Sequence, residues 1–145
     1  GQRSAQQGHW PRFQPSKEIA VAESKLEKGQ ELVAKLFGAA PGGARVPMPA
    51  DFGRYSIEHL FGDVWQGKDL SLQERSLTTC TVLVALAREN EQRAHFRGAR
   101  NVGISRAKLE AMITHVAHYA GWPVAASALR VLDEVWTAMD KEMKG

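Results

Sequence analysis

The stretch Leu70–Pro123 decides the fold of this chain: it reads LSLQERSLTT at 70–79, HFRGARNVG at 95–103 and HVAHYAGWP at 115–123. An apolar run follows the first block. The ionisable side chains on segments that otherwise have the pattern of buried helices are His95, Arg97, Arg100, His115 and His118. Charged and imidazole groups on core helices need partners or a function. The stretch therefore predicts packed helices that carry functional side chains.

Local signals delimit the helices of this stretch. Ser71 and Glu74 have the spacing of a capping box, which predicts the start of a helix that continues to about Arg88. That helix is apolar nearly all round, so we expect it at the centre of the molecule. The signals that follow predict three more helices, at about 91–102, 106–120 and 123–141. Short connections between these helices favour antiparallel neighbours.

Toward the amino terminus the sequence predicts two further helices. The first spans 16–37 with Ser16 as its N-cap, and the second spans about 50–65, with a loop between them. No segment alternates convincingly with a period of two. We therefore expect an all-α, single-domain bundle of about six helices over residues 16–145, preceded by an arm at 1–15.

Composition limits the function classes. A chain of 145 residues is long enough for one domain with a real core. Cys80 is the single cysteine, which excludes an internal disulfide and a Cys-x-x-Cys redox pair. The formal net charge of +3 is mild and spread out, so we expect no nucleic-acid partner. No apolar run is long enough to span a bilayer, and no signal peptide is visible, so we expect a cytoplasmic protein without a membrane partner.

His95 is the first candidate for catalysis. Its unperturbed pKa lies near neutrality, which suits general acid–base chemistry. Arg97 and Arg100 follow it closely and could bind an anionic substrate. An ordinary exposed histidine on an amphipathic helix is the alternative.

His115 and His118 lie three residues apart and share a helix face, with Tyr119 beside His115. A histidine pair at this spacing can contribute to a metal site, but no recognised zinc pattern surrounds it, and we expect no metal. The alternative is a packed helix with one histidine at a subunit surface and one toward a pocket.

Two carboxylates and one arginine complete the candidates. Glu74 can act as an acid or base, or simply satisfy backbone donors at its helix start. Asp63 lies in HLFGDVW, where a carboxylate among aromatic rings can have a raised pKa, or lie at the surface. Arg75 would seek a carboxylate partner or an anionic ligand. Cys80 is most simply a small buried apolar residue.

From about Glu23 to Trp136 the chain resembles the carboxymuconolactone decarboxylase family, which belongs to the superfamily of alkylhydroperoxidase D. The resemblance rests on KGQELV, FGDVW, LSLQERSLT, ALARENE, HFRGARNVGIS and HVAHYAGWP, with the last two blocks the most specific. It implies an all-helical fold that assembles into trimers or hexamers, with active sites near subunit contacts. The peroxidase branch carries a Cys-x-x-Cys pair four residues before its histidine. Here those positions hold Arg88 and Glu91, so disulfide-based peroxide reduction is excluded.

The resemblance therefore points to the decarboxylase branch. It implies an enzyme that removes carbon dioxide from a small carboxylated lactone such as 4-carboxymuconolactone, without a cofactor. His95 would deliver a proton to carbon, with Glu74 or Asp63 as companion acids. The expected substrate-binding residues are Arg75, Arg97, Arg100, His115, His118, Tyr119 and Trp122.

Three alternatives stay open at this stage. One is an isomerase or another non-redox proton-transfer enzyme of the same family. Another is a non-catalytic oligomeric protein that binds a small apolar acid. The third is a metal-dependent enzyme that uses His95, His115 and His118. Trp122 stands where the family usually has a smaller residue, and this leaves the substrate open.

Overall fold

The protein is a helical bundle with a central pair of helices and a further layer of helices on each side of that pair. The computed structural model describes residues 15–38 and 48–145, and this part of the chain contains no strand. The α-helices are α1 (Pro15–Phe37), α2 (Ala50–Arg54), α3 (Leu72–Ala85), α4 (Glu89–Asn101), α5 (Arg106–Ala120) and α6 (Trp122–Lys144). A π-helix, η1 (Tyr55–Phe61), and a 3-10 turn, η2 (Val64–Gln66), lie between α2 and α3. The predicted all-α class is confirmed.

Helix ends agree with the sequence prediction wherever a local cap defines them. The Ser71 hydroxyl accepts from the Glu74 backbone N–H and the Glu74 carboxylate accepts from the Ser71 N–H, which completes the capping box. Ser105 caps α5 in the same way, through the backbone N–H of Lys108. At the amino end α1 begins at Pro15, so Ser16 lies inside the helix and the prediction of Ser16 as its N-cap is wrong. Most of the predicted arm and of the first loop lies outside the described residues.

The prediction of one continuous helix over 50–65 is wrong. The segment starts as α2, widens into the π-helix η1, breaks at Gly62 and Asp63, and ends in the single turn η2. The cause is a close crossing with α1. A Cβ on Gly29 would lie 2.0 Å from the Ile57 carbonyl oxygen, and one on Gly62 would lie 2.1 Å from that of Lys25. π-helical turns usually occur as short insertions of this kind, often beside functional sites.

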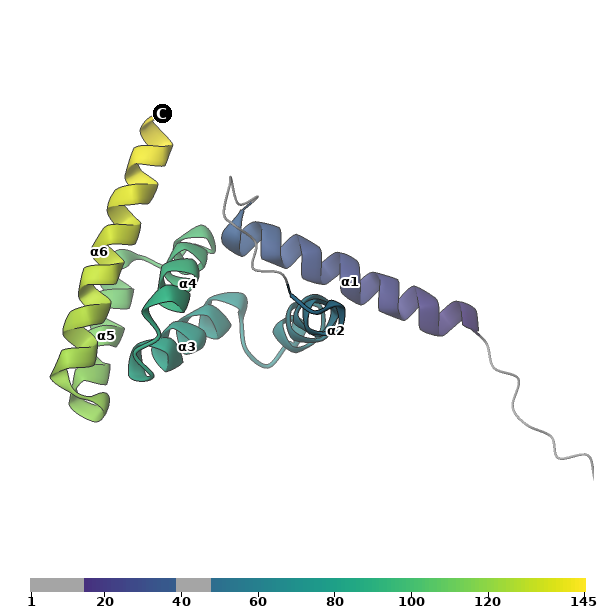
Figure 1. Cartoon of the computed structure of the whole chain (residues 1–145), viewed down its shortest axis with the longest axis horizontal. Coiled ribbons are helices and arrows are strands. Elements are labelled where there is room, and N and C mark those ends of the chain that lie inside the picture. The colour runs from purple at the N-terminus through teal and green to yellow at the C-terminus, as the bar shows by residue number, and fades with distance from the viewer. Residues whose placement is uncertain (1–14, 39–47) are drawn as a thin grey trace, which may run out of the picture.

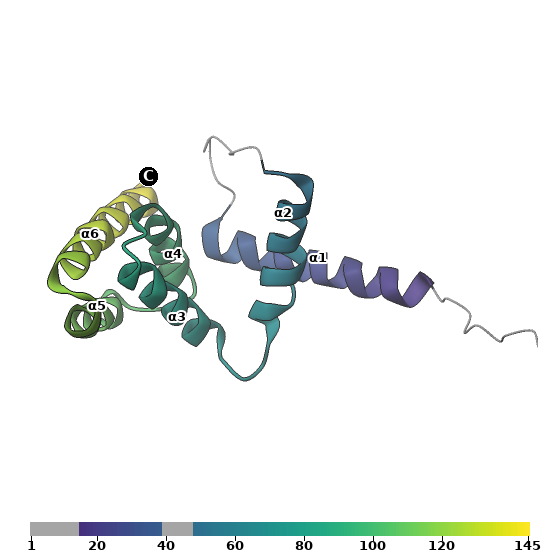
Figure 2. The ribbon, with the colours of Figure 1, turned by 60° about the horizontal axis from the view of Figure 1, so that its bottom comes forward.

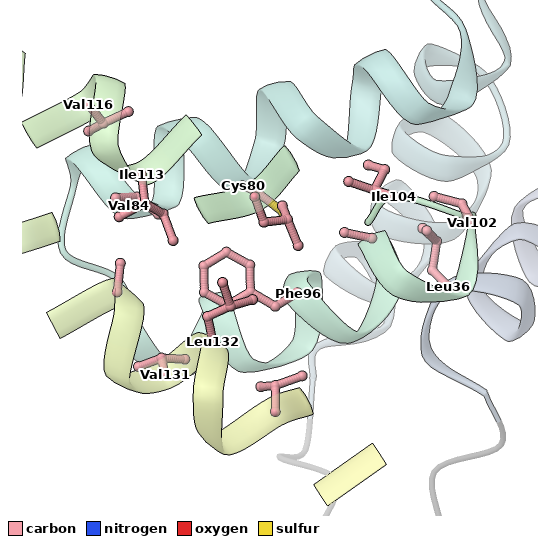
Figure 3. Packing of buried hydrophobic residues seen from close by; sticks show 14 of the residues in the cluster. Leu36, Cys80, Val84, Phe96, Val102, Ile104, Ile113, Val116, Val131 and Leu132 are labelled. Atoms are coloured by element: carbon pink, nitrogen blue, oxygen red, sulfur yellow. The ribbon is translucent and has the colours of Figure 1, made fainter. Parts of the chain in front are cut away.

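The hydrophobic core lies between α3, α4, α5 and α6. Figure 3 shows Phe96 of α4 surrounded by Cys80 and Val84 of α3, Ile113 of α5 and Leu132 of α6. The prediction that α3 is central is confirmed by its packing against all three other helices. Toward its carboxyl end the helix has an open side, because Val82 and the adjoining Leu86 are exposed.

Helix α1 joins the bundle through its carboxyl end. The Asn101 side-chain amide donates to the Leu36 carbonyl at 2.7 Å, and Gly98 of α4 lies against the Leu36 side chain. In both views α1 and α2 lie on one side of the α3–α4 pair, and α5 and α6 lie on the other (Figures 1 and 2). None of the helices in residues 15–38 and 48–145 combines the length and the apolar character that a bilayer crossing requires.

Candidate active site

His95 lies in an aromatic box where α1, η1 and η2 meet α4. Its ring centroid is 5.2 Å from that of Phe37, edge to face, and 6.4 Å from that of Trp65, with the two planes stacked. Phe61 closes the box, because its ring contacts both Phe37 at 6.0 Å and Trp65 at 5.5 Å. The open alternative of an ordinary exposed histidine is therefore wrong: His95 is half-buried and lies against rings from α1 and η2.

The box determines the charge state of His95. Burial lowers the pKa of the imidazole below its usual value, and the nearby Glu91 carboxylate opposes that shift. The ring is therefore mostly neutral near pH 7, with one nitrogen as a donor and the other as an acceptor. Nδ1 is buried and meets no hydrogen-bond partner among the described residues. Such an atom in a native fold calls for an explanation, and a catalytic role is one.

Arg75 supports the same region from α3. Its Nη2 donates to the Gly67 carbonyl at 3.1 Å, immediately after η2. Its Nε is buried and, like His95 Nδ1, meets no partner within the described part of the chain. The η2 region is thus contacted by two residues with unused hydrogen-bonding capacity, His95 through the Trp65 ring and Arg75 through the Gly67 carbonyl.

The two candidate carboxylates do not enter the box. Glu74 is exposed and serves as the capping residue of α3. Asp63 is exposed and pairs with Lys25 at 3.1 Å, so the interpretation of Asp63 as a carboxylate enclosed by aromatic rings is wrong. Neither placement tests a role in catalysis, which stays a prediction.

Arg97 and Arg100 already have carboxylate partners. Arg97 makes two hydrogen bonds to Glu142, at 2.6 and 2.8 Å, and this pairing lowers the pKa of the Glu142 carboxyl. Arg100 pairs with Asp140 at 2.7 Å and stacks over the Trp136 ring. Both arginines line a broad cleft of about 1250 Å³ between α4 and α6, which Phe37 also borders. Their predicted role as substrate anchors stays a prediction.

The remaining candidates form a second group on the outer face of α5. His115 and Tyr119 have ring centroids 5.1 Å apart, and His118 meets Trp122 edge to face at 5.4 Å. His118 Nδ1 lies 2.8 Å from the Thr114 carbonyl oxygen. This group is exposed, and α5 lies across the α3–α4 pair from α1, the helix that carries Phe37 (Figure 2). The structure therefore does not bring Trp122 into one pocket with His95 within a single subunit.

A second cleft, which the sequence did not indicate, adjoins the aromatic box. It has a volume of about 360 Å³ and is lined by α1, η2 and the loop before α3. Trp65 belongs both to this cleft and to the His95 box. Three lysines line it: Lys28, Lys35 and Lys68.

Sequence reasoning also missed the aromatic box. Phe37, Phe61 and Trp65 were visible only as apolar positions or as part of FGDVW. Their meeting depends on how α1 crosses η1, which no short motif encodes. The one available signal was the concentration of aromatic residues close to the ends of two predicted helices.

Thiol redox chemistry and metal binding each require a particular set of side chains. Arg88 and Glu91 stand where the peroxidase branch of the superfamily has its two cysteines. They form an ion pair here, with Arg88 Nη2 2.6 Å from Glu91 Oε1. Burial raises the pKa of the only thiol, Cys80, to about 12, so it supplies no thiolate near neutral pH. In the described part of the chain, no three histidine, cysteine or carboxylate side chains gather as a metal site would require.

Comparison with known proteins places these residues in a family. Residues 50–134 match the model of the carboxymuconolactone decarboxylase family. The chain belongs to that family. The matched segment contains His95, Trp65, Glu74 and Arg75. Phe37 and the cleft residues Lys28 and Lys35 lie outside it.

Two curated relatives support the assignment. The chain is 37% identical over 86 residues to 4-carboxymuconolactone decarboxylase of Acinetobacter baylyi, an alignment that covers 59% of this chain and 64% of that protein. It is 32% identical over 74 residues to nitrosuccinic acid decarboxylase of Metarhizium robertsii, with coverage of 51% and 52%. The chain therefore spans less than two thirds of the length of either relative.

Proposed function

We propose that this family member is a cofactor-free decarboxylase that acts on a small carboxylated lactone such as 4-carboxymuconolactone. The observation that carries the proposal is His95: a half-buried, mostly neutral imidazole with an unpartnered nitrogen, inside the segment that matches the family. The names of both relatives describe removal of carbon dioxide from a small acid.

The proposed reaction has two steps. The bond between the ring carbon and its carboxylate breaks, and its electron pair moves into the unsaturated lactone to form a dienolate while carbon dioxide leaves. A proton from His95 then forms the new C–H bond, and the imidazole regains a proton from solvent. The aromatic box favours the first step, because a weakly hydrated carboxylate loses carbon dioxide to a product that carries more delocalised charge.

The proton that His95 donates must be present in the complex. Burial disfavours the imidazolium in the free protein, but a substrate carboxylate bound beside the ring would favour it. Substrate binding would thus favour protonation of His95, and the dienolate would later take up this proton. The proposal predicts that the falling limb of kcat lies at a higher pH than the falling limb of kcat/KM, since the two report the complex and the free enzyme.

The direct test is turnover of 4-carboxymuconolactone by the wild type and by His95→Gln. Loss of one general acid typically costs on the order of 10²–10⁴ in rate, and we expect a fall in kcat of that size. His59→Gln is the matched control, because His59 is an exposed histidine on η1 outside the box. Wild-type kcat in His95→Gln would remove His95 from the mechanism.

A nitro-substituted dicarboxylic acid is the second candidate substrate, favoured by the Metarhizium relative. A nitro group beside the lost carboxylate accepts the electron pair as a nitronate, so the same proton donor completes the reaction. Assaying nitrosuccinate in parallel with the lactone decides between them. Binding of both acids without release of carbon dioxide would instead favour a non-catalytic binding protein.

A further inference from the structure

The cleft beside the aromatic box has an unusual lining. Lys28 and Lys35 lie two turns apart on one face of α1, with Leu32 between them, and Lys68 faces the same space from the loop before α3. Leu32 and Trp65 are buried and form an apolar floor together with the half-buried Leu72. The cleft thus combines an apolar base with a cationic rim.

The lysines of this cleft are not neutralised by ion pairs. In the described residues no carboxylate lies within salt-bridge distance of Lys28, Lys35 or Lys68; the recorded bridges join other residues. Glu31 also lines the cleft, so one negative charge offsets part of the three positive ones. The net positive lining contrasts with Arg97 and Arg100, which each engage a carboxylate.

One contact connects the cleft with the candidate catalytic group, and a second contact holds the loop that carries Lys68. Trp65 lines the cleft and stacks on His95, so the two sites share one side chain. Gly67 also lines the cleft, and its carbonyl accepts the Arg75 hydrogen bond that positions the loop carrying Lys68. A Cβ at Gly67 would lie 2.6 Å from Arg75 Nη2, so a larger residue would displace this contact.

We propose that this cleft binds the carboxylates of a small planar dicarboxylic acid, with Lys28, Lys35 and Lys68 as the anion-binding residues. Its volume of about 360 Å³ falls within the usual range of small-ligand pockets. Resting on the function proposed above, it would hold the substrate carboxylate that does not react. The binding itself does not depend on any reaction.

The first test is calorimetric binding of trans,trans-muconate, a planar dicarboxylate without a lactone, to the wild-type protein at low ionic strength. The double variant Lys28→Gln/Lys35→Gln should bind it about 3- to 20-fold more weakly, since each exposed charge contributes modestly. Raising the salt should also weaken wild-type binding, and the dimethyl ester should not bind. In NMR spectra the indole N–H of Trp65 should shift on titration with muconate.

Lys108→Gln/Lys144→Gln is the matched control, because both lysines are exposed on α5 and α6 and lie outside the cleft lining. Unchanged affinity in the cleft variant, an equal loss in this control, or no binding to the wild type would overturn the proposal. Turnover separates the two hypotheses. If muconate binding depends on the lysines but the protein does not decarboxylate the lactone or nitrosuccinate, the proposed function is refuted. The cleft then remains a carboxylate-binding site. With both correct, the cleft variant raises KM for the lactone several-fold at nearly constant kcat.

Discussion

At the scale of single residues, His95 is the position where stability and chemistry conflict. A buried polar atom without a partner costs roughly 1–3 kcal/mol, and nothing in the described residues relieves this cost at His95 Nδ1. The surrounding rings also oppose the charged form of the imidazole. Packing alone would favour an apolar residue at this position. The presence of an imidazole is therefore better explained by function than by stability.

The depressed pKa of His95 predicts how stability depends on pH. The unfolded chain protonates this histidine at its usual pKa, whereas the folded protein resists protonation. Stability from His95 is therefore complete above about pH 6.5 and is lost as the pH falls toward the folded pKa, because the unfolded state binds more protons. Urea unfolding of the wild type between about pH 5 and 8 should show this fall, and His95→Gln should reduce it. Equal pH slopes in the two proteins would contradict the prediction.

Cys80 should be inert and dispensable for catalysis. Its side chain is fully buried, its Sγ lies 3.5 Å from the His95 carbonyl oxygen, and burial raises its pKa to about 12. A thiol reagent at pH 8 should therefore label the native protein slowly and the unfolded protein quickly. Cys80→Ala should keep turnover within a few-fold and lose about 1 kcal/mol of stability for the buried group removed. A folded Cys80→Ala protein with a hundredfold lower rate would give the thiol a catalytic role.

Residue-level prediction from the sequence succeeded where the signal was local. Glu74 was identified as a capping residue because its partner, Ser71, lies three positions away. The prediction that His95 is catalytic came from its motif, and it stays a prediction. The rings around it and the pairing of Asp63 with Lys25 join segments far apart in the chain, and no spacing rule reports such contacts.

At the scale of elements, the crossing of α1 with η1 is the feature that positions the aromatic box. The two backbones approach closely because Gly29 and Gly62 have no side chains. We predict that Gly29→Ala destabilises the protein by about 2–3 kcal/mol, since the added methyl meets the Ile57 backbone rather than a movable side chain. Thermal unfolding of the variant measures this effect.

Gly53→Ala is the matched control for that substitution. Gly53 lies in α2 with open space around its Cβ position, so alanine there should be neutral or stabilise by up to about 1 kcal/mol through helix propensity. Similar melting temperatures for the two variants would show that the crossing is not tightly packed. If Gly29→Ala loses more lactone turnover than its smaller fraction of folded protein explains, the α1–η1 crossing also positions the aromatic box around His95.

The elements were predictable to different degrees for the same physical reason. The predicted range of α5 is the observed one, because Ser105 and Gly121 are local boundary signals. The segment 50–65 carries a helical pattern throughout, yet tertiary contact with α1 divides it into three pieces. Propensity describes an isolated segment, and a close backbone crossing overrides it.

At the scale of the whole molecule, exposed apolar side chains lie at both ends of the bundle. Phe52 and Tyr55, on α2 and η1, are 59% and 58% exposed. Tyr119 and Trp122, at the turn between α5 and α6, are 82% and 64% exposed. Figure 1 places these two regions on opposite sides of the α3–α4 pair. Apolar groups gathered in this way commonly mark protein contacts.

We therefore propose that the chain forms a homo-oligomer, with a trimer or hexamer as the expected state. Two different apolar regions on opposite sides suit a head-to-tail contact, which closes into a ring when the rotation between neighbours permits. In such a ring the His115–Trp122 group of one subunit would contact a neighbouring subunit. These residues would then lie near the neighbour's active site, although they share no pocket with His95 of their own subunit. The double variant Tyr119→Ser/Trp122→Ser should weaken assembly, because it removes two large apolar contacts while leaving the core of α5 intact. Sedimentation at micromolar concentration measures the mass, and a wild-type species at the chain mass of 16.0 kDa would refute the assembly.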